Sequence, residues 1–134
     1  MCPAQPGPET IIRYLRSMTT LEDLQRICNG FPAVTTDIKW EDHLCFNVGD
    51  KFFLVTAPDS VPVSATFKVP DDDFEAVCEK PGCGPAPYLA RYKWVRVDDI
   101  ARFTVSEWEQ LLNDSYRIVA SKLPAKLRRA LGIG

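Results

Sequence analysis

Two apolar segments joined by a glycine turn limit the possible folds of this chain more than any other feature. The segments are HLCFNV (43–48) and KFFLVT (51–56), and only Gly49 and Asp50 separate them. Short runs of strand-forming residues around a two-residue glycine turn are typical of a β-hairpin. A preceding strand is expected from Thr35, because apolar and polar residues alternate there. The centre of the chain therefore predicts an antiparallel sheet.

The glycine turn also predicts the register of this hairpin. Val48 would lie opposite Lys51, Phe46 opposite Phe53 and Leu44 opposite Val55, which makes one face an apolar layer. The opposite face would be a mixed surface, half covered or used for contact, that carries His43, Cys45, Asn47, Phe52, Leu54 and Thr56.

Two capping boxes predict helices on either side of the strands. Thr20 with Asp23 begins a helix that ends at Gly30, and Thr104 with Glu107 begins the longest helix. Leu123-Pro124 is expected to bend or restart that second helix. The apolar stripes are Leu21, Leu24, Ile27 and Cys28 in the first helix, and Trp108, Leu111, Leu112, Ser115, Tyr116 and Val119 in the second.

Three further elements are expected between these helices. VSATFKV (63–69) predicts a strand with Ala65, Phe67 and Val69 inward, and Asp71–Asp73 are expected to cap a short helix with Phe74, Val77 and Cys78 toward the core. PGCGPAP (81–87) predicts a connection rather than the continuation of the helix. The last strand would place Tyr92, Trp94 and Arg96 on one face and Arg91, Lys93, Val95 and Val97 on the other.

Length and composition favour one domain. The chain has 134 residues, of which 46% are hydrophobic, enough for a core without disulfides or metal. Residues 18–134 would form this domain, and the proline-rich residues 1–17 an extension, partly disordered or with a short helix around Ile11. The N-terminus lacks a signal-peptide pattern, no apolar run approaches the roughly 20 residues of a membrane span, and the five cysteines are scattered. We therefore expect a cytoplasmic protein without a membrane partner.

The net charge of −2 conceals two oppositely charged parts. Residues 18–79 contain four basic and twelve acidic residues, whereas residues 80–134 contain ten basic and five acidic ones. Phosphate binding depends on local Lys and Arg density, which only the second part supplies.

The sites that could carry catalysis or a metal each have a simpler interpretation. His43, the only histidine, has no nucleophile and carboxylate in a recognisable motif around it. Cys78 and Cys83 lack a second closely spaced pair that could complete a zinc site. The acidic run from Asp71 to Glu79 could hold a cation, but solvation and dipole compensation explain it better. No enzyme activity, metal or cofactor is expected.

Basic and aromatic residues interleave in one segment and give the best functional signal. Lys and Arg can reach phosphates while aromatic rings stack or insert. The residues are Arg91, Tyr92, Lys93, Trp94 and Arg96. A solvated basic strand with a core tryptophan is the simpler alternative.

Four segments together resemble the MmcQ/YjbR family of small bacterial proteins. They are DIKWEDHLCFNVGDKFF (37–53), FKVPDDDFEAV (67–77), PGCGPAPYLARYKWVRV (81–97) and LLNDSYRIVASKLP (111–124), and the resemblance extends from Thr19 to about Leu127. It implies a CyaY- or frataxin-like α+β domain: an antiparallel sheet with helices packed on one face. Members are commonly described as candidate DNA-binding proteins with a double wing, which here would map to Trp40–Leu54 and Arg91–Arg96.

The leading hypothesis is a non-enzymatic module that binds double-stranded DNA. The residues expected to contact DNA are Lys39, Trp40, Lys68, Arg91, Tyr92, Lys93, Trp94 and Arg96. The alternatives are a protein partner on the mixed sheet face, or a frataxin-like module that binds a cation or small ligand through Asp71–Asp73 and Glu75.

Overall fold

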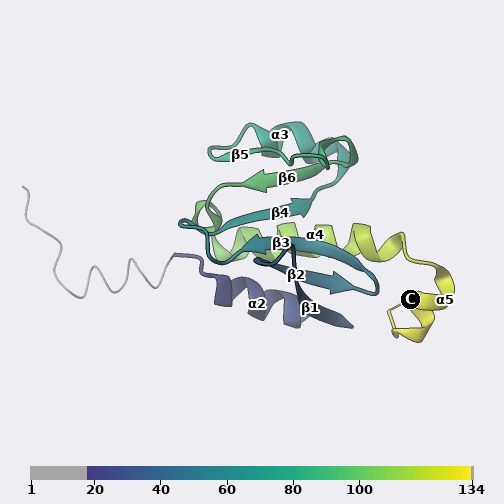
Figure 1. The fold of residues 1–134 in the computed structure, drawn as a ribbon. Coiled ribbons are helices and arrows are strands. Elements are labelled where there is room, and N and C mark those ends of the chain that lie inside the picture. The colour runs from purple at the N-terminus through teal and green to yellow at the C-terminus, as the bar shows by residue number, and fades with distance from the viewer. Residues whose placement is uncertain (1–17, 134) are drawn as a thin grey trace, which may run out of the picture.

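The computed structural model describes residues 18–133 and contains a six-stranded antiparallel sheet (Figure 1). The strands are β1 (Val34–Lys39), β2 (His43–Val48), β3 (Lys51–Ala57), β4 (Ser64–Lys68), β5 (Cys83–Pro85) and β6 (Trp94–Val97). Their order is β1-β2-β3-β4-β6-β5, so β1 and β5 form the two edges. The helix expected around Ile11 lies outside the described residues.

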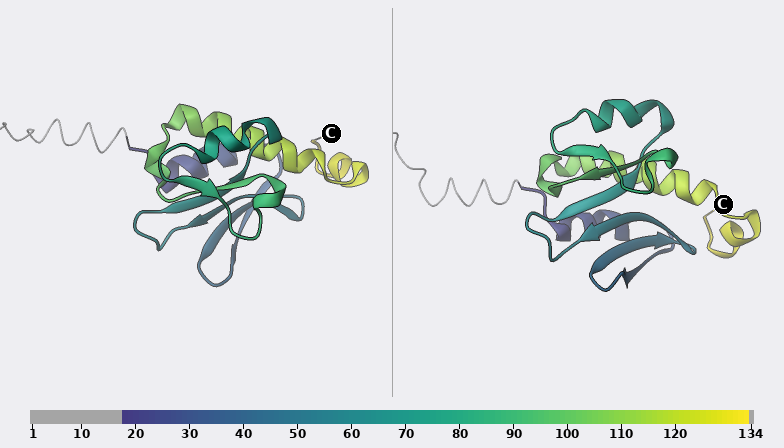
Figure 2. Two further views of the ribbon diagram at one scale, coloured as in Figure 1. Left: turned by 90° about the horizontal axis from the view of Figure 1, so that it is seen from above. Right: turned by 45° about the horizontal axis from the view of Figure 1, so that its top comes forward.

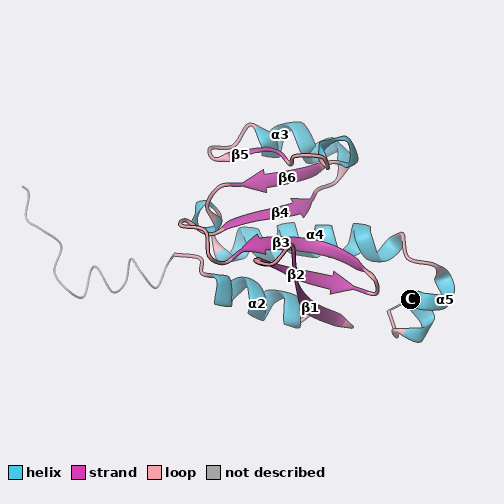
Figure 3. Ribbon diagram, in the orientation of Figure 1, coloured by secondary structure: helices cyan, strands magenta, loops and turns pink. Residues whose placement is uncertain are grey.

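Within residues 18–133 four α-helices accompany the sheet, which confirms the predicted α+β architecture. They are α2 (Leu21–Asn29), α3 (Phe74–Cys78), α4 (Val105–Ser121) and α5 (Ala125–Ala130). Helices α2 and α4 pack against one face of the sheet, as the cyan and magenta elements of Figure 3 show. No helix within residues 18–133 is long and apolar enough to cross a membrane.

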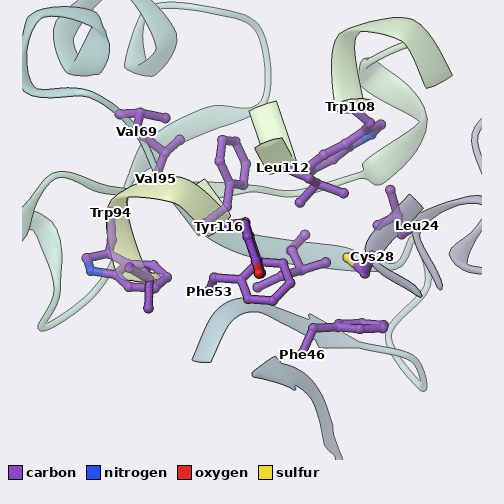
Figure 4. Packing of buried hydrophobic residues seen from close by; sticks show 14 of the residues in the cluster. Leu24, Cys28, Phe46, Phe53, Val69, Trp94, Val95, Trp108, Leu112 and Tyr116 are labelled. Carbon is purple, nitrogen blue, oxygen red and sulfur yellow. The ribbon is translucent and has the colours of Figure 1, made fainter. Parts of the chain in front are cut away.

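The two predicted capping boxes are confirmed, and the helix they start at Thr104 supplies much of the core. Trp108, Leu112 and Tyr116 of α4 are buried in this core, and the rings of Trp108 and Tyr116 meet aromatic residues of the strands (Figure 4). The Trp108 ring lies 5.2 Å from that of Phe67, and the Tyr116 ring 5.4 Å from that of Phe53. Edge-to-face contacts at such distances add stability beyond the buried area.

The register of the β2–β3 hairpin is correct at its turn and wrong further along. Val48 pairs with Lys51, but a bulge then inserts one residue into β3, so that Phe46 pairs with Leu54 rather than Phe53. Phe53 and Leu54 are both fully buried. A bulge shifts the alternation of the strand by one residue. Val55 therefore replaces Leu54 and Thr56 on the face predicted to be mixed.

The segment predicted as a strand from Arg91 becomes a strand only at Trp94. Ala90–Tyr92 forms a 3-10 turn, and Lys93 has a left-handed backbone with φ of 67°. From there the predicted alternation is confirmed: Val95 and Val97 are fully buried, and Arg96 is exposed. Part of the predicted connection also pairs with this strand, as β5.

The expected capping by Asp71–Asp73 is wrong, because no side chain in this segment caps a helix. The chain enters α3 through a 3-10 turn, in which the Asp73 amide donates to the Pro70 carbonyl at 2.9 Å. The backbone thus takes the hydrogen bond expected of the carboxylates.

The helix restarts after Leu123-Pro124, as predicted, and α5 folds back over the β2–β3 turn. A Cβ atom on Gly49, whose φ is 64°, would lie 3.1 Å from Leu123 and 3.2 Å from Leu127. This turn is therefore covered, which excludes the tip of the predicted Trp40–Leu54 wing from projecting freely.

Candidate functional site

The outer face of the sheet, which we define as the side opposite α2 and α4, collects polar and aromatic side chains. Cross-strand pairing aligns Cys45, Val55, Thr66 and Arg96 in one row. A second row contains Asn47 and Phe52, and the paired Lys68 and Trp94. The outer face thus includes three of the residues expected to contact DNA.

Two segments project from this side of the sheet and are called the two wings below. The first is the β1–β2 hairpin, and the second is the loop of residues 86–93. In the left view of Figure 2 both extend away from the helices. Their aromatic residues are strongly exposed: Trp40 at 62%, Tyr88 at 98% and Tyr92 at 54%.

Both wings contain backbone conformations that side-chain-bearing residues rarely adopt. Among residues 18–133, five non-glycine residues have positive φ, and four of them lie in the wings: Trp40, Glu41, Tyr88 and Lys93. Such conformations are unfavourable and concentrate at functional sites, where surrounding contacts maintain them. The four positive φ values therefore indicate that the backbone of each wing is held in a defined conformation.

A row of aromatic rings crosses the outer face between the wings. The Phe52 ring lies 6.2 Å from the Trp40 ring and 5.3 Å from the Trp94 ring. Trp40 also meets the His43 ring at 5.9 Å. Phe52 therefore separates two pockets, one on each side of this row.

The first pocket is rich in lysine and is called the lysine pocket. It has a volume of about 560 Å³. The residues that line it are Lys39, Lys51, Lys68 and Lys122, with Asp50, Phe52, Tyr92, Trp94 and Val119. Four ammonium groups and one carboxylate give it a positive character.

The second pocket is more apolar and is called the aromatic pocket. It has a volume of about 540 Å³. The residues that line it are Trp40, His43, Phe52, Val55, Thr66, Ala86, Pro87, Tyr88, Leu89 and Arg96. Both wings thus contribute to its walls.

The structure brings together six of the eight residues expected to contact DNA. Lys39, Lys68, Tyr92 and Trp94 line the lysine pocket, and Trp40 and Arg96 line the aromatic pocket. Arg91 and Lys93 lie outside both pockets.

Two of the eight residues are buried, whereas Arg91 is exposed and Lys93 is partly exposed. Lys68 and Trp94 are each 7% exposed, and the Lys68 ammonium donates to the Tyr92 carbonyl. Arg91 is exposed beside the Tyr92 ring, 5.1 Å from its centre, and Lys93 lies 5.0 Å from the centre of the Phe74 ring. Burial leaves Lys68 and Trp94 in the floor of the site rather than on its surface.

Lys51 and Lys122 are the two lysines of the lysine pocket that the sequence did not indicate as site residues. Lys122 is the C-cap of α4, and Lys51 begins β3. Their positions follow from how α4 crosses the sheet. Local sequence patterns carry no signal for such a convergence.

The charges of this site affect Lys68 directly. Burial lowers the pKa of the Lys68 ammonium, the nearby Lys122 and Lys93 lower it further, and Asp71 opposes the change. A positive charge on Lys68 is therefore disfavoured in the folded protein, and an anion nearby would favour it.

The remaining candidate groups are His43 and the described cysteines. His43 Nδ1 lies 2.7 Å from Asp42 Oδ1 at the tip of the first wing. The described cysteines are free thiols, and burial raises the pKa of Cys28 to about 12 and that of Cys45 to about 11. Within residues 18–133 no group of three or more His, Cys, Asp or Glu side chains could hold a metal ion.

Comparison with known proteins shows which family this sequence matches. The sequence model of the YjbR family matches residues 29–118. No curated protein matches the chain.

Two solved structures share the fold. One is the crystal structure of protein DR2400 of Deinococcus radiodurans, described with the family domain DUF419: it is 24% identical, has a TM-score of 0.77, and the alignment covers 87% of this chain and 91% of that one. The other is a protein from Pseudomonas syringae with 17% identity and a TM-score of 0.61, aligned over 75% of this chain and 98% of that one. At these identities the similarity establishes the fold alone.

Proposed function

Because this chain belongs to the YjbR family, we propose that it is a non-enzymatic module that binds double-stranded DNA with the outer face of its sheet and the two wings. The wings would straddle the phosphate backbone. Lys39, Arg91, Lys93 and Arg96 would contact phosphates, while Trp40 and Tyr92 would contact the sugars or the groove.

The arrangement of the wings is the main support for this proposal. Two exposed segments extend from the same side of the sheet, and each combines a cation with an exposed aromatic ring: Lys39 with Trp40, and Arg91 with Tyr92. Phosphate contacts position a protein on a duplex, and side chains that enter a groove can then read its shape.

The overall charge of the chain makes the contribution of individual cations measurable. A protein with a net charge of −2 has little general attraction for DNA, so that binding depends on a few local contacts. Loss of two such contacts should therefore be visible in both affinity and salt dependence.

The test is fluorescence anisotropy of a labelled duplex at several salt concentrations, with a double charge reversal. Arg91→Glu with Arg96→Glu changes two exposed residues that form no salt bridge in the described part of the chain. Each phosphate contact contributes about 0.9 to the slope of log K against log salt, so we expect the slope to fall by about two units.

A matched control uses the same charge change on other surfaces. Arg117→Glu with Lys80→Glu alters exposed residues of α4 and of the segment after α3. In this control, the slope of log K against log salt should fall much less than in the Arg91/Arg96 variant. Equal slopes for wild type and the Arg91/Arg96 variant would contradict the assignment of the face.

A protein partner is the second candidate, and the aromatic pocket is the observation that favours it. Trp40 and Tyr88 expose large apolar surfaces at its rim. Exposed apolar groups that gather at one place are typical of protein contact sites. Absence of duplex binding at low salt would favour this candidate over DNA.

A further inference from the structure

The lysine pocket combines residues from distant parts of the chain in a way that DNA binding by the wings does not require. Lys39 ends β1, Lys51 begins β3, Lys68 ends β4 and Lys122 caps α4. These ammonium groups surround a volume of about 560 Å³, within the range of pockets that hold small molecules.

The positive charge of this pocket is incompletely compensated by protein carboxylates. Lys39 pairs with Asp37 at 3.0 Å. Among residues 18–133, Lys51, Lys68 and Lys122 take part in no salt bridge, and Asp50 is the single carboxylate that lines the pocket. Like charges gathered in one place disfavour folding unless solvent or a bound anion screens them.

The walls of the pocket are apolar and partly flat. The rings of Phe52 and Trp94 meet at 5.3 Å with an angle of 60°, and Val119 closes one side. Tyr92, 54% exposed, adds a further ring at the opening. An aromatic ligand ring could contact these side chains, while its charged group reaches the lysines.

We propose that the lysine pocket binds a phosphate group attached to a planar ring, the chemistry of a mononucleotide. The ammonium groups of Lys51 and Lys122 donate hydrogen bonds to the phosphate oxygens, and Lys68 adds positive charge from the floor. The ring lies against Trp94 and Tyr92. This site goes beyond DNA binding by the wings, and it does not depend on that function.

The test compares three probes by isothermal titration calorimetry: AMP, adenosine and inorganic phosphate. AMP contains both the ring and the anion, so we expect saturable binding of one AMP per chain, at least about tenfold tighter than either part alone. The proposal would be contradicted if AMP bound no tighter than adenosine or no tighter than inorganic phosphate. It would also be contradicted if AMP gave no saturable heat.

Substitution of exposed lysines locates the site without disturbing the core. Lys51→Ser with Lys122→Ser should weaken AMP binding by about tenfold or more, since hydrogen bonds to charged groups are among the stronger ones. The control, Lys80→Ser with Lys126→Ser, removes two exposed lysines that do not line the pocket and should keep the wild-type affinity. Unchanged AMP affinity in the Lys51/Lys122 variant would place any binding elsewhere.

The same titration separates this site from Arg91 and Arg96 of the DNA-binding surface, whereas Lys39 and Tyr92 belong to both surfaces. Arg91→Glu with Arg96→Glu should leave AMP affinity within about twofold of wild type, because neither residue lines the lysine pocket. If that variant loses AMP binding while Lys51→Ser with Lys122→Ser retains it, the nucleotide site belongs to the wings and the proposal is wrong.

Discussion

Ser115 of α4 donates its hydroxyl hydrogen to the carbonyl oxygen of Phe53, 2.6 Å away at the bulge of β3. The same hydroxyl accepts a hydrogen bond from the Lys68 amide at 3.1 Å. A bulge leaves backbone groups without partners in the ladder. One buried hydroxyl thus connects α4 to two neighbouring strands and satisfies the groups that the irregular register leaves free.

Replacement of Ser115 by alanine should therefore destabilise the protein more than loss of one ordinary hydrogen bond. The Phe53 carbonyl and the Lys68 amide would both lose a partner inside the core, and we expect a decrease of about 1 to 3 kcal/mol in the free energy of unfolding. Urea denaturation measures it. Ser121→Ala, whose hydroxyl bonds only to the Ile118 carbonyl on the surface, is the control, and an equal effect in both variants would contradict this role.

Gly82 should tolerate no side chain, in contrast to Gly84. At Gly82 the φ is 76° and a Cβ atom would overlap the Asp98–Arg102 ion pair, so Gly82→Ala should lower the free energy of unfolding by about 1 to 3 kcal/mol. At Gly84 a Cβ atom would meet nothing within 4 Å. Gly84→Ala should change stability by less than about 0.5 kcal/mol, and thermal melts of both variants make the comparison.

Trp94 and Trp40 were both expected from the sequence to contact DNA, but replacing them by alanine should change the free energy of unfolding by different amounts. Trp94 is 7% exposed, so Trp94→Ala should lower the free energy of unfolding by about 3 to 5 kcal/mol. Trp40 is 62% exposed, and Trp40→Ala should lower it by less than about 1 kcal/mol while weakening duplex binding. A Trp40 variant that folds and binds the duplex like wild type would exclude this residue from the interface.

Lys68 should make stability depend on pH in the alkaline range. Its pKa is lowered from an ordinary value of 10.5 by burial and by the charges of Lys122 and Lys93. Between the folded and unfolded pKa values the unfolded chain binds more protons, so this residue adds stability as pH rises. Urea melts of wild type and Lys68→Met across this range should show that rise only in wild type; parallel curves would contradict the lowered pKa.

The buried thiols should react slowly with alkylating reagents in the native protein. Burial raises the pKa of Cys28 to about 12, which leaves almost no thiolate at pH 8, whereas Cys78 and Cys83 are half-buried. Iodoacetamide treatment followed by peptide mass spectrometry should show Cys28 labelled last. Labelling of Cys28 as fast as Cys78 would indicate that α2 separates from the sheet.

Local patterns in the sequence were sufficient to predict the helices and the approximate positions of the strands. The capping boxes at Thr20 and Thr104 determine where α2 and α4 begin, because each uses groups only three residues apart. The alternation in β6 likewise placed Val95 and Val97 on the face opposite Arg96, but the sequence left open which of the two faces meets the core. The segments that resemble the YjbR family predicted the correct fold class, because their order along the chain corresponds to the order of the helices and strands.

The sequence alone determined the fold class, the helix starts and the basic and aromatic segments from which a site could be built. The tertiary structure decided the bulge at Phe53, the burial of Lys68 and Trp94, and the meeting of Lys51 with Lys122. The bulge and the approach of Lys122 to Lys51 depend on where α4 crosses the sheet: its packing buries Phe53 and Leu54 together, and its C-terminal end brings Lys122 to the start of β3. Lys68 and Trp94 are buried on the other face, where Lys68 donates to the Tyr92 carbonyl and Trp94 packs against Phe52. Contacts between residues so far apart in sequence arise only when the whole core packs, and no local pattern contains them.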